Sequence, residues 1–261
     1  MTMAMASWAR FPHPDAFAFT EASLRKKWSK LHAGDQEPWP KDPAVLAAWV
    51  LFHGGEYQQA YTAGLRAGPA GFTVANKAAC VYAHYLEPKE KTKQDLFLEV
   101  AARAAQQVKD EPENANAYYL QGYALGRYSQ GISVAKALAQ GVGGKVKSAL
   151  ETAIHLQPLH ADAHIALGAF HAEVIDKVGA LIGNMTYGAK KDSSLQMFQR
   201  GLELKPESPI ALMEYAHGLI MLDGEKKMAE ATALYERAAA AKPLDAVECL
   251  DVELAQSELA D

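Results

Sequence analysis

The segment Ala163-His164-Ile165-Ala166-Leu167-Gly168-Ala169-Phe170-His171, followed by Gly201-Leu202-Glu203-Leu204-Lys205-Pro206, decides the fold. In the first segment the bulky His164 lies four positions before Gly168, so both residues lie on one face of a helix. The small Gly168 lets a second helix approach closely. Pro206 ends that second helix, because proline has no N–H and disfavours helical geometry in the preceding residue. Together the segments predict a unit of two packed helices.

This unit is repeated along the chain. Pro112, Pro158, Pro206 and Pro243 each follow a helical turn, and another helix is predicted to begin after each of them. The helix starts at Ala117 and Ala211 superpose on the one at Ala163 when residues are counted from the preceding proline. A recurring phrase of this kind is typical of a helical repeat array.

The pattern resembles the tetratricopeptide repeat (TPR) family, whose signature of large, small, aromatic and proline positions spans about 34 residues. An earlier unit is visible in Gly54-Gly55-Glu56-Tyr57-Gln58-Gln59-Ala60, while Phe72 to Pro112 matches poorly. The resemblance implies an all-α fold, a right-handed superhelical solenoid of antiparallel helix pairs. It places about five hairpins in residues 43–245.

Two adjacent repeats are longer than the family pattern. Pro158 follows Pro112 by 46 residues, and Pro206 follows Pro158 by 48. The excess falls in residues 127–145 and 173–191, which are interrupted by glycines. If the two helices of a pair share the excess, each grows by about 10 Å. We expect these hairpins to protrude from the solenoid, and the sequence leaves their role open.

The two ends of the chain read as caps on the array. Residues 1–42 contain a predicted helix from Thr20 to His32, which places Trp28 on the first repeat, and then a proline-rich stretch. Because this helix is also basic, the alternative is that it binds a membrane surface or a partner protein, acting as a hook. Residues 246–261 predict a half-polar capping helix with an acidic, solvated tail. An exposed acidic docking tail is the alternative for that end.

Composition excludes several classes of protein. The chain has 261 residues, 49% of them hydrophobic, and a net charge of −5, which favours a folded protein and argues against broad electrostatic capture of nucleic acid. It contains no apolar run long enough to span a membrane and no recognisable signal peptide. Cys80 and Cys249 lack metal-site or disulfide-framework spacing, so we expect reduced thiols and a cytoplasmic protein.

No catalytic or cofactor motif is present. Gly141-Val142-Gly143-Gly144-Lys145 lacks the first glycine and the Ser or Thr of a phosphate-binding loop. His160, His164 and His171 suggest a metal site, but two of them occupy internal packing positions of the repeat. We therefore expect no metal, no cofactor and no enzymatic activity.

The first helices of the hairpins are expected to line a concave binding surface. Mapping the repeat register predicts its residues as Trp49, Phe52, Asn76, His84, Tyr119, Tyr123, Arg127, Glu173, Met213 and His217. Val45, Cys80, Ile165 and Ala169 fall in the same register. Tyr119 and Tyr123, one helical turn apart, are the strongest candidates, unless the inserted segments fold over and bury them.

These observations predict a non-enzymatic scaffold that binds a peptide or helix of a partner protein in the concave groove. A second copy of the chain is also a candidate partner. The alternative is a carrier of a small molecule or lipid, with an apolar pocket between the lengthened hairpins.

Overall fold

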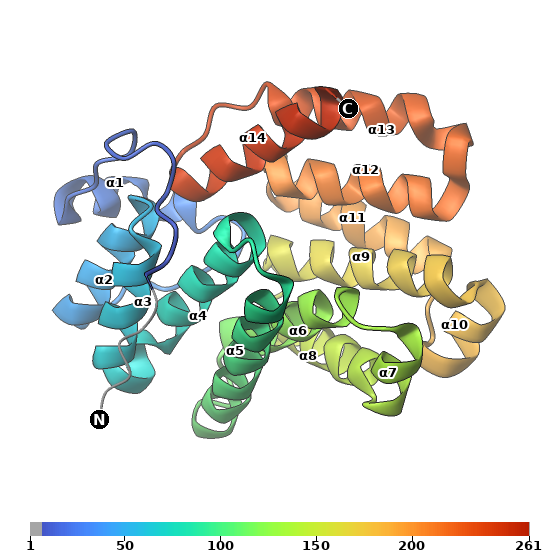
Figure 1. Cartoon of the computed structure of the whole chain (residues 1–261), viewed down its shortest axis with the longest axis horizontal. Helices are drawn as coiled ribbons and strands as arrows, with labels where there is room; N and C mark the ends of the chain where they lie inside the picture. Colours follow the sequence, from blue (N-terminus) through green and yellow to red (C-terminus); the bar gives the residue numbers. More distant parts are fainter. Residues whose placement is uncertain (1–6, 261) are drawn as a thin grey trace.

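The computed structural model describes residues 7–260, and every regular element in this range is a helix (Figure 1). The α-helices are α1 (Glu21–Leu31), α2 (Pro43–His53), α3 (Tyr57–Arg66), α4 (Phe72–Val81), α5 (Glu90–Asp110), α6 (Ala115–Gln130), α7 (Val134–Ala139), α8 (Val142–Leu156), α9 (Ala161–Val178), α10 (Ala180–Tyr187), α11 (Lys191–Leu204), α12 (Pro209–Asp223), α13 (Met228–Ala239) and α14 (Ala246–Ala260). Short 3-10 turns cover Gly68–Gly71 and Gly224–Lys227, and a π-helical turn covers Tyr82–Leu86.

Five antiparallel pairs form the solenoid: α2 with α3, α4 with α5, α6 with α8, α9 with α11, and α12 with α13. The prediction of an all-α solenoid of about five hairpins is confirmed. Each pair also packs against the next. The buried apolar residues form one large cluster over the first four pairs and two smaller clusters around α11, α12 and α13.

Small residues let the helices of a pair approach closely, as their spacing predicted. A Cβ atom on Gly122 of α6 would lie 2.9 Å from Cγ of Leu150 on α8. One on Gly168 of α9 would lie 3.1 Å from the ring of Phe198, which is completely buried on α11. In both pairs a bulky side chain fills the space above a glycine.

The two insertions differ from the expectation that both helices of each pair would grow. Instead, each insertion forms a short separate helix, α7 between α6 and α8, and α10 between α9 and α11. Glycine explains the breaks, since Gly179 (φ 82°) and Gly188 (φ 65°) bound α10 with backbone angles that favour glycine. The two short helices lie at the same end of the molecule, away from α1 (Figure 1).

Helix α1 covers the first hairpin. Trp28 meets Trp49 of α2 edge to face at a centroid distance of 5.7 Å, and its indole N–H donates to the carbonyl oxygen of Glu37 at 2.8 Å. Leu24 and Trp28 are both buried. The apolar side of this basic helix is therefore occupied, which removes the observation that favoured a hook.

Helix α14 does more than cap the last hairpin. It packs on α12 and α13 and also reaches α2, so the end of the solenoid returns to its beginning. Nδ1 of His53 on α2 lies 2.6 Å from the carboxylate of Asp245, and the hydroxyl of Tyr85 donates to Asp251. Asp251 is only 3% exposed, so the expectation of a solvated acidic face is wrong at this residue, because α14 lies across the concave side of the array.

Candidate functional site

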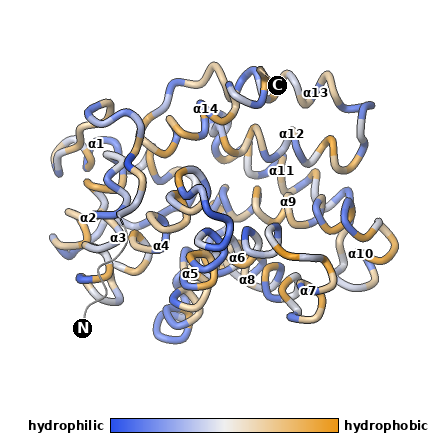
Figure 2. The backbone as a smooth tube through the Cα atoms, viewed as in Figure 1, coloured by the Kyte–Doolittle hydropathy of each residue, from blue (hydrophilic) through white to orange (hydrophobic). Residues whose placement is uncertain are grey.

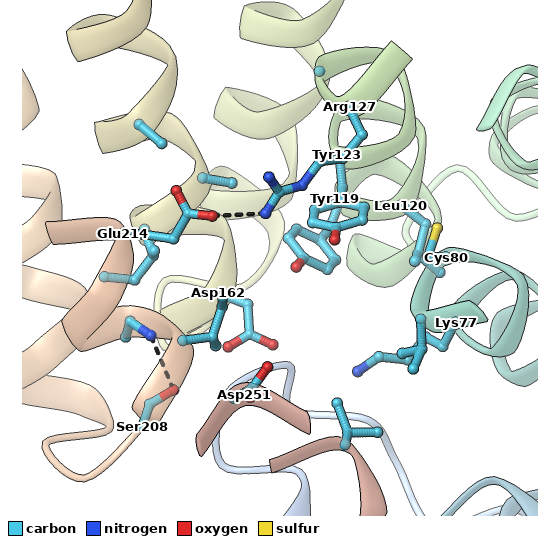
Figure 3. Close-up of a pocket in the computed structure, with 18 of the residues that line it drawn as sticks. Lys77, Cys80, Tyr119, Leu120, Tyr123, Arg127, Asp162, Ser208, Glu214 and Asp251 are labelled. Atoms are coloured by element: carbon cyan, nitrogen blue, oxygen red, sulfur yellow. Dashed lines mark hydrogen bonds and ion pairs between the residues drawn. The ribbon is translucent and has the colours of Figure 1, made fainter. Parts of the chain in front are cut away.

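A pocket of about 210 Å³ lies on the concave side of the solenoid, between the first helices of the hairpins and α14 (Figure 3). The lining residues come from helices along most of the chain. Examples are Phe52 of α2, Lys77 of α4, Tyr123 of α6, Asp162 of α9, Glu214 of α12 and Asp251 of α14. The first helices therefore form the walls of this pocket, and α14 narrows what would otherwise be an open groove.

Helix α6 supplies one wall through residues spaced four apart. Tyr119, Tyr123 and Arg127 share a face, and the two phenol rings lie 5.9 Å apart between centroids. The Arg127 guanidinium lies over the ring of Tyr123 at 5.3 Å, and its Nη2 donates to Glu214 of α12 at 2.6 Å. Neither tyrosine is fully buried, and both line the pocket. The inserted segments thus leave the aromatic pair accessible.

Lys77 of α4 lies on the opposite wall, with its ammonium group directed at the pocket (Figure 3). It forms an ion pair with Asp35, which also lies 2.9 Å from Nδ1 of His32. Burial alone would raise the pKa of Asp35, but Lys77 and then His32 hold this pKa well below its usual value. The charge of Lys77 is therefore already balanced within the protein.

Two carboxylates differ from those in ion pairs. Asp162, in the first turn of α9, is drawn inside the pocket in Figure 3, and its carboxylate forms no hydrogen bond or ion pair with the described residues. Asp251 accepts the Tyr85 hydroxyl, and burial raises its pKa to about 7. Six acidic side chains line the pocket, and even with Asp251 partly protonated near neutral pH they outnumber the cations of Lys77, Arg127 and Lys205. This excess of acidic groups favours a cationic occupant.

Five of the ten predicted groove residues line the pocket, namely Phe52, Tyr119, Tyr123, Arg127 and Glu173. Cys80, Ile165 and Ala169, from the same register, line it too. Their role in binding a partner stays a prediction.

The other five predicted residues lie outside it: Trp49, Asn76, His84, Met213 and His217. Trp49 and Asn76 are fully buried and Met213 is 1% exposed, so these three belong to the core and not to the groove surface. His84 is partly buried, with no hydrogen-bond partner for Nε2 among the described residues. His217 is exposed beside Tyr235 of α13, on a different surface.

A one-residue difference in register accounts for part of the disagreement. Tyr85, within the π-helical turn Tyr82–Leu86, lines the pocket in place of His84. On α12, Glu214 takes the place assigned to Met213, and on α4 Lys77 takes the place assigned to Asn76. A charged residue beside Asn76 and beside Met213 was the available signal at those two positions. Nothing local in the sequence indicated Asp251, because α14 was assigned to the end of the array.

The three histidines considered for a metal site are used within the fold. His160 caps α9, accepting the N–H of Ala163 at Nδ1, and its Nε2 contacts Asn116 at 2.9 Å. His164 contacts the carbonyl oxygen of Pro158, and His171 is buried. Each of the three therefore has a structural environment of its own.

One other group of side chains could hold a metal among residues 7–260. The ligand atoms of His13, Cys249 and Glu253 lie within 4.8 Å of one another, where the N-terminal segment meets α14. Histidine, cysteine and glutamate are all zinc ligands, but the group is partly exposed, and the contact between His13 and Glu253 accounts for two of its members.

The fold is that of a TPR solenoid. The structure is similar to the crystal structure of a thermophilic TPR protein from Thermus thermophilus, with a TM-score of 0.57 and 18% sequence identity. The match covers 82% of this chain and 97% of the other. No protein-family model and no curated protein matches the sequence. Within the described residues, no helix has both the length and the apolar character needed to cross a membrane.

Proposed function

We propose that the protein is a non-enzymatic scaffold that holds a short cationic segment of a partner protein in the concave pocket. The observation that carries this proposal is the unpaired Asp162 carboxylate on the same pocket as Tyr119 and Tyr123. A lysine or arginine side chain, or a peptide N-terminus, forms an ion pair with a carboxylate and is attracted to the face of an aromatic ring.

Helix α14 favours a side chain or an extended peptide end over a helix. An α-helix with its side chains is about 10–12 Å wide. Residues of α14 line the pocket together with the first helices of the hairpins, so α14 occupies part of the space that a partner helix would need in the groove. Of the two predicted ligands, a peptide and a helix, the peptide therefore has the better support.

The ionisable groups of the pocket support a binding role over catalysis. Arg127 and Glu214 neutralise each other, as do Lys205 and Glu248, whose charged atoms lie 2.8 Å apart. Cys80 is the thiol that lines the pocket, and burial raises its pKa to about 12, so it is protonated and unreactive near neutral pH. These groups are suited to recognition of a charge.

The test is a selection from a library of random heptapeptides with free N-termini. Selected peptides are synthesised, and their affinity for the wild type and for Asp162→Asn is measured by fluorescence anisotropy. We expect the peptides to be rich in lysine or arginine, and their affinity to fall at least tenfold in the variant, because the ion pair formed in the pocket loses its negative charge.

Asp176→Asn is the matched control, because Asp176 is an exposed carboxylate on the same helix, α9, outside the pocket. Peptides that bind both variants equally well, or peptides that are predominantly acidic, would contradict the proposed function. Binding of small organic amines in place of peptides, detected by a rise in melting temperature, would show a carrier.

The predicted alternative, an apolar carrier pocket between the lengthened hairpins, has one matching feature. A cavity of about 80 Å³ lies between the two insertions, lined by Val134, Leu138, Val174 and Tyr187 among others. This cavity is less than half the size of the concave pocket of about 210 Å³, so it has little room for a lipid chain. The concave pocket remains the better supported site.

A further inference from the structure

The inserted helix α10 exposes its apolar side chains to solvent. Leu181 is 74% exposed, Ile182 58% and Met185 80%, the three highest exposures among the large hydrophobic residues of the described chain. Figure 2 shows hydrophobic residues along this helix at the edge of the molecule. Exposed apolar residues gathered on one short element mark an interaction site, whereas single ones are ordinary.

The helix is anchored so that this apolar side points outward. A Cβ atom on Gly183 would lie 2.9 Å from Cγ1 of Val174, so the Gly183 side of α10 packs on α9. Leu181 and Met185 are four residues apart and lie nearly opposite Gly183 around the helix. They form an outward crest with Ile182 beside it.

The neighbouring insertion adds to the same region. Val134 and Leu138 of α7 are 39% and 44% exposed and line the small cavity that separates the two insertions. We call Val134, Leu138, Leu181, Ile182 and Met185 the apolar tip. Two helices joined to the body by glycine-containing turns carry it, so it lies beyond the packed part of the solenoid.

The two inserted segments that carry the apolar tip have a net charge opposite to that of the rest of the chain. Residues 132–147 and 176–191 contain six lysines and one aspartate, a net charge of +5, so the remaining residues carry −10. Within the described chain three of these lysines form ion pairs, Lys147 with Glu151, Lys177 with Glu173, and Lys191 with Asp223. Lys136, Lys145 and Lys190 are exposed and form none with the described residues.

This charge decides between the occupants that an apolar surface could take. A second copy docked tip to tip would bring two lysine-rich surfaces together, which is unfavourable. An anionic surface would instead be attracted by the lysines while the apolar crest leaves water. The other basic cluster, on α1, cannot act in the same way, because Leu24 and Trp28 beneath it are buried.

We propose that the apolar tip docks the protein peripherally on an anionic phospholipid surface. Leu181, Ile182 and Met185 would insert at the boundary between headgroups and acyl chains, and Lys136, Lys145 and Lys190 would face the phosphate groups. Short elements of this composition bind the interface without crossing it. The proposal uses none of the acidic groups of the concave pocket, so the two sites can be tested separately.

The experiment is co-sedimentation of the full chain with vesicles of 70% phosphatidylcholine and 30% phosphatidylserine, and with vesicles of phosphatidylcholine alone. We expect binding to the first kind only, weakened when ionic strength rises from 0.1 to 0.5 M. Leu181→Ser/Met185→Ser is expected to lower the partition coefficient about tenfold or more. Lys145→Glu/Lys190→Glu is expected to lower it about 30-fold or more, since each lysine contributes about a factor of five.

Matched controls lie elsewhere on the surface. Leu98→Ser/Met228→Ser changes two exposed apolar residues outside the tip, and Lys26→Glu/Lys27→Glu reverses two exposed charges on α1. Both are expected to bind vesicles like the wild type. Circular dichroism confirms that each variant is folded.

Three results would overturn the proposal. The first is no binding of the wild type to anionic vesicles. The second is binding that survives the tip substitutions, or that is equal on neutral vesicles. The third is concentration-dependent self-association, seen by sedimentation velocity and abolished by Leu181→Ser/Met185→Ser, which would assign the tip to a second copy.

Discussion

Nη2 of Arg127 on α6 lies 2.6 Å from Oε1 of Glu214 on α12, although 87 residues separate them in sequence. Both side chains are mostly buried, with 16% and 17% of their surface exposed. The ion pair spans the concave side past α9, so it joins two walls of the pocket that the order of the repeats would keep apart. Because the pair joins α6 to α12, the shape of the pocket depends on the curvature of the solenoid between these helices.

Breaking this pair is expected to cost stability. Arg127→Met should lower the free energy of unfolding by about 3 kcal/mol, because Glu214 is left mostly buried and unpaired, while Arg127→Met/Glu214→Met should recover most of the loss. Urea denaturation measures both. Arg200→Met is the control, since Arg200 and Glu203 form an exposed pair expected to contribute less than about 1 kcal/mol. A double variant as unstable as the single one would contradict the expectation.

Glu37 is expected to make stability depend on pH. Burial and then the charge of Asp35 raise the pKa of Glu37 from 4.5 to about 8. An acid with a raised pKa in the folded state favours folding below its unfolded pKa, and this contribution is lost as pH rises through about 8. Wild-type stability should therefore decline between pH 4.5 and 8 by an amount on the order of 4 kcal/mol relative to Glu37→Gln.

The Gln variant keeps an oxygen that can accept the hydrogen bond from Nδ2 of Asn116, 2.5 Å away in the wild type. Urea denaturation at several pH values compares the two proteins. Parallel stability profiles for wild type and Glu37→Gln across this range would contradict the expectation, because they would show that ionisation of Glu37 does not lower the free energy of unfolding.

Two glycines of the solenoid are expected to respond in opposite ways to the same change. A Cβ atom on Gly64 of α3 would lie 2.7 Å from the carbonyl oxygen of Gly71, so Gly64→Ala must move backbone and should destabilise by about 2 kcal/mol. Gly126 of α6 has open space around its Cα, and Gly126→Ala should stabilise by about 0.5–1 kcal/mol. Thermal unfolding monitored by circular dichroism distinguishes them, and equal effects would refute the packing argument.

The aromatic pair is expected to contribute to binding more than to stability. Tyr119→Ser and Tyr123→Ser should each weaken the selected cationic peptides by about fivefold or more, because the cation loses an aromatic face. The melting temperature should fall only slightly, since neither ring is fully buried. A fall in melting temperature of more than about 10 °C with unchanged peptide affinity would show that the tyrosines are core residues and not binding residues.

The sequence predicted the elements that depend on local packing. Gly122, Gly168 and the prolines that follow the second helices gave the hairpins and about five repeats, and Trp28 was correctly placed on the first repeat. On α6, where the motif was clear, the register identified Tyr119, Tyr123 and Arg127 as lining residues. These features are determined locally, because the period of a helix fixes which side chains share a face.

The same method failed by one position on α4 and α12. Lys77, Tyr85 and Glu214 line the pocket where Asn76, His84 and Met213 were expected, and α1 covers Trp49. An error of one position turns a side chain by about 100° around its helix, which is enough to move it from the groove to the core.

Closure of the solenoid was decided by the tertiary structure alone. The contacts of His53 with Asp245 and of Tyr85 with Asp251 bring the end of the chain to its beginning, and they turn an open groove into a pocket with an excess of acid. Each repeat contacts mainly its neighbours, so its sequence specifies one small rotation relative to the next. Whether the ends meet depends on the sum of those rotations over the whole array, which the sequence of no single repeat specifies.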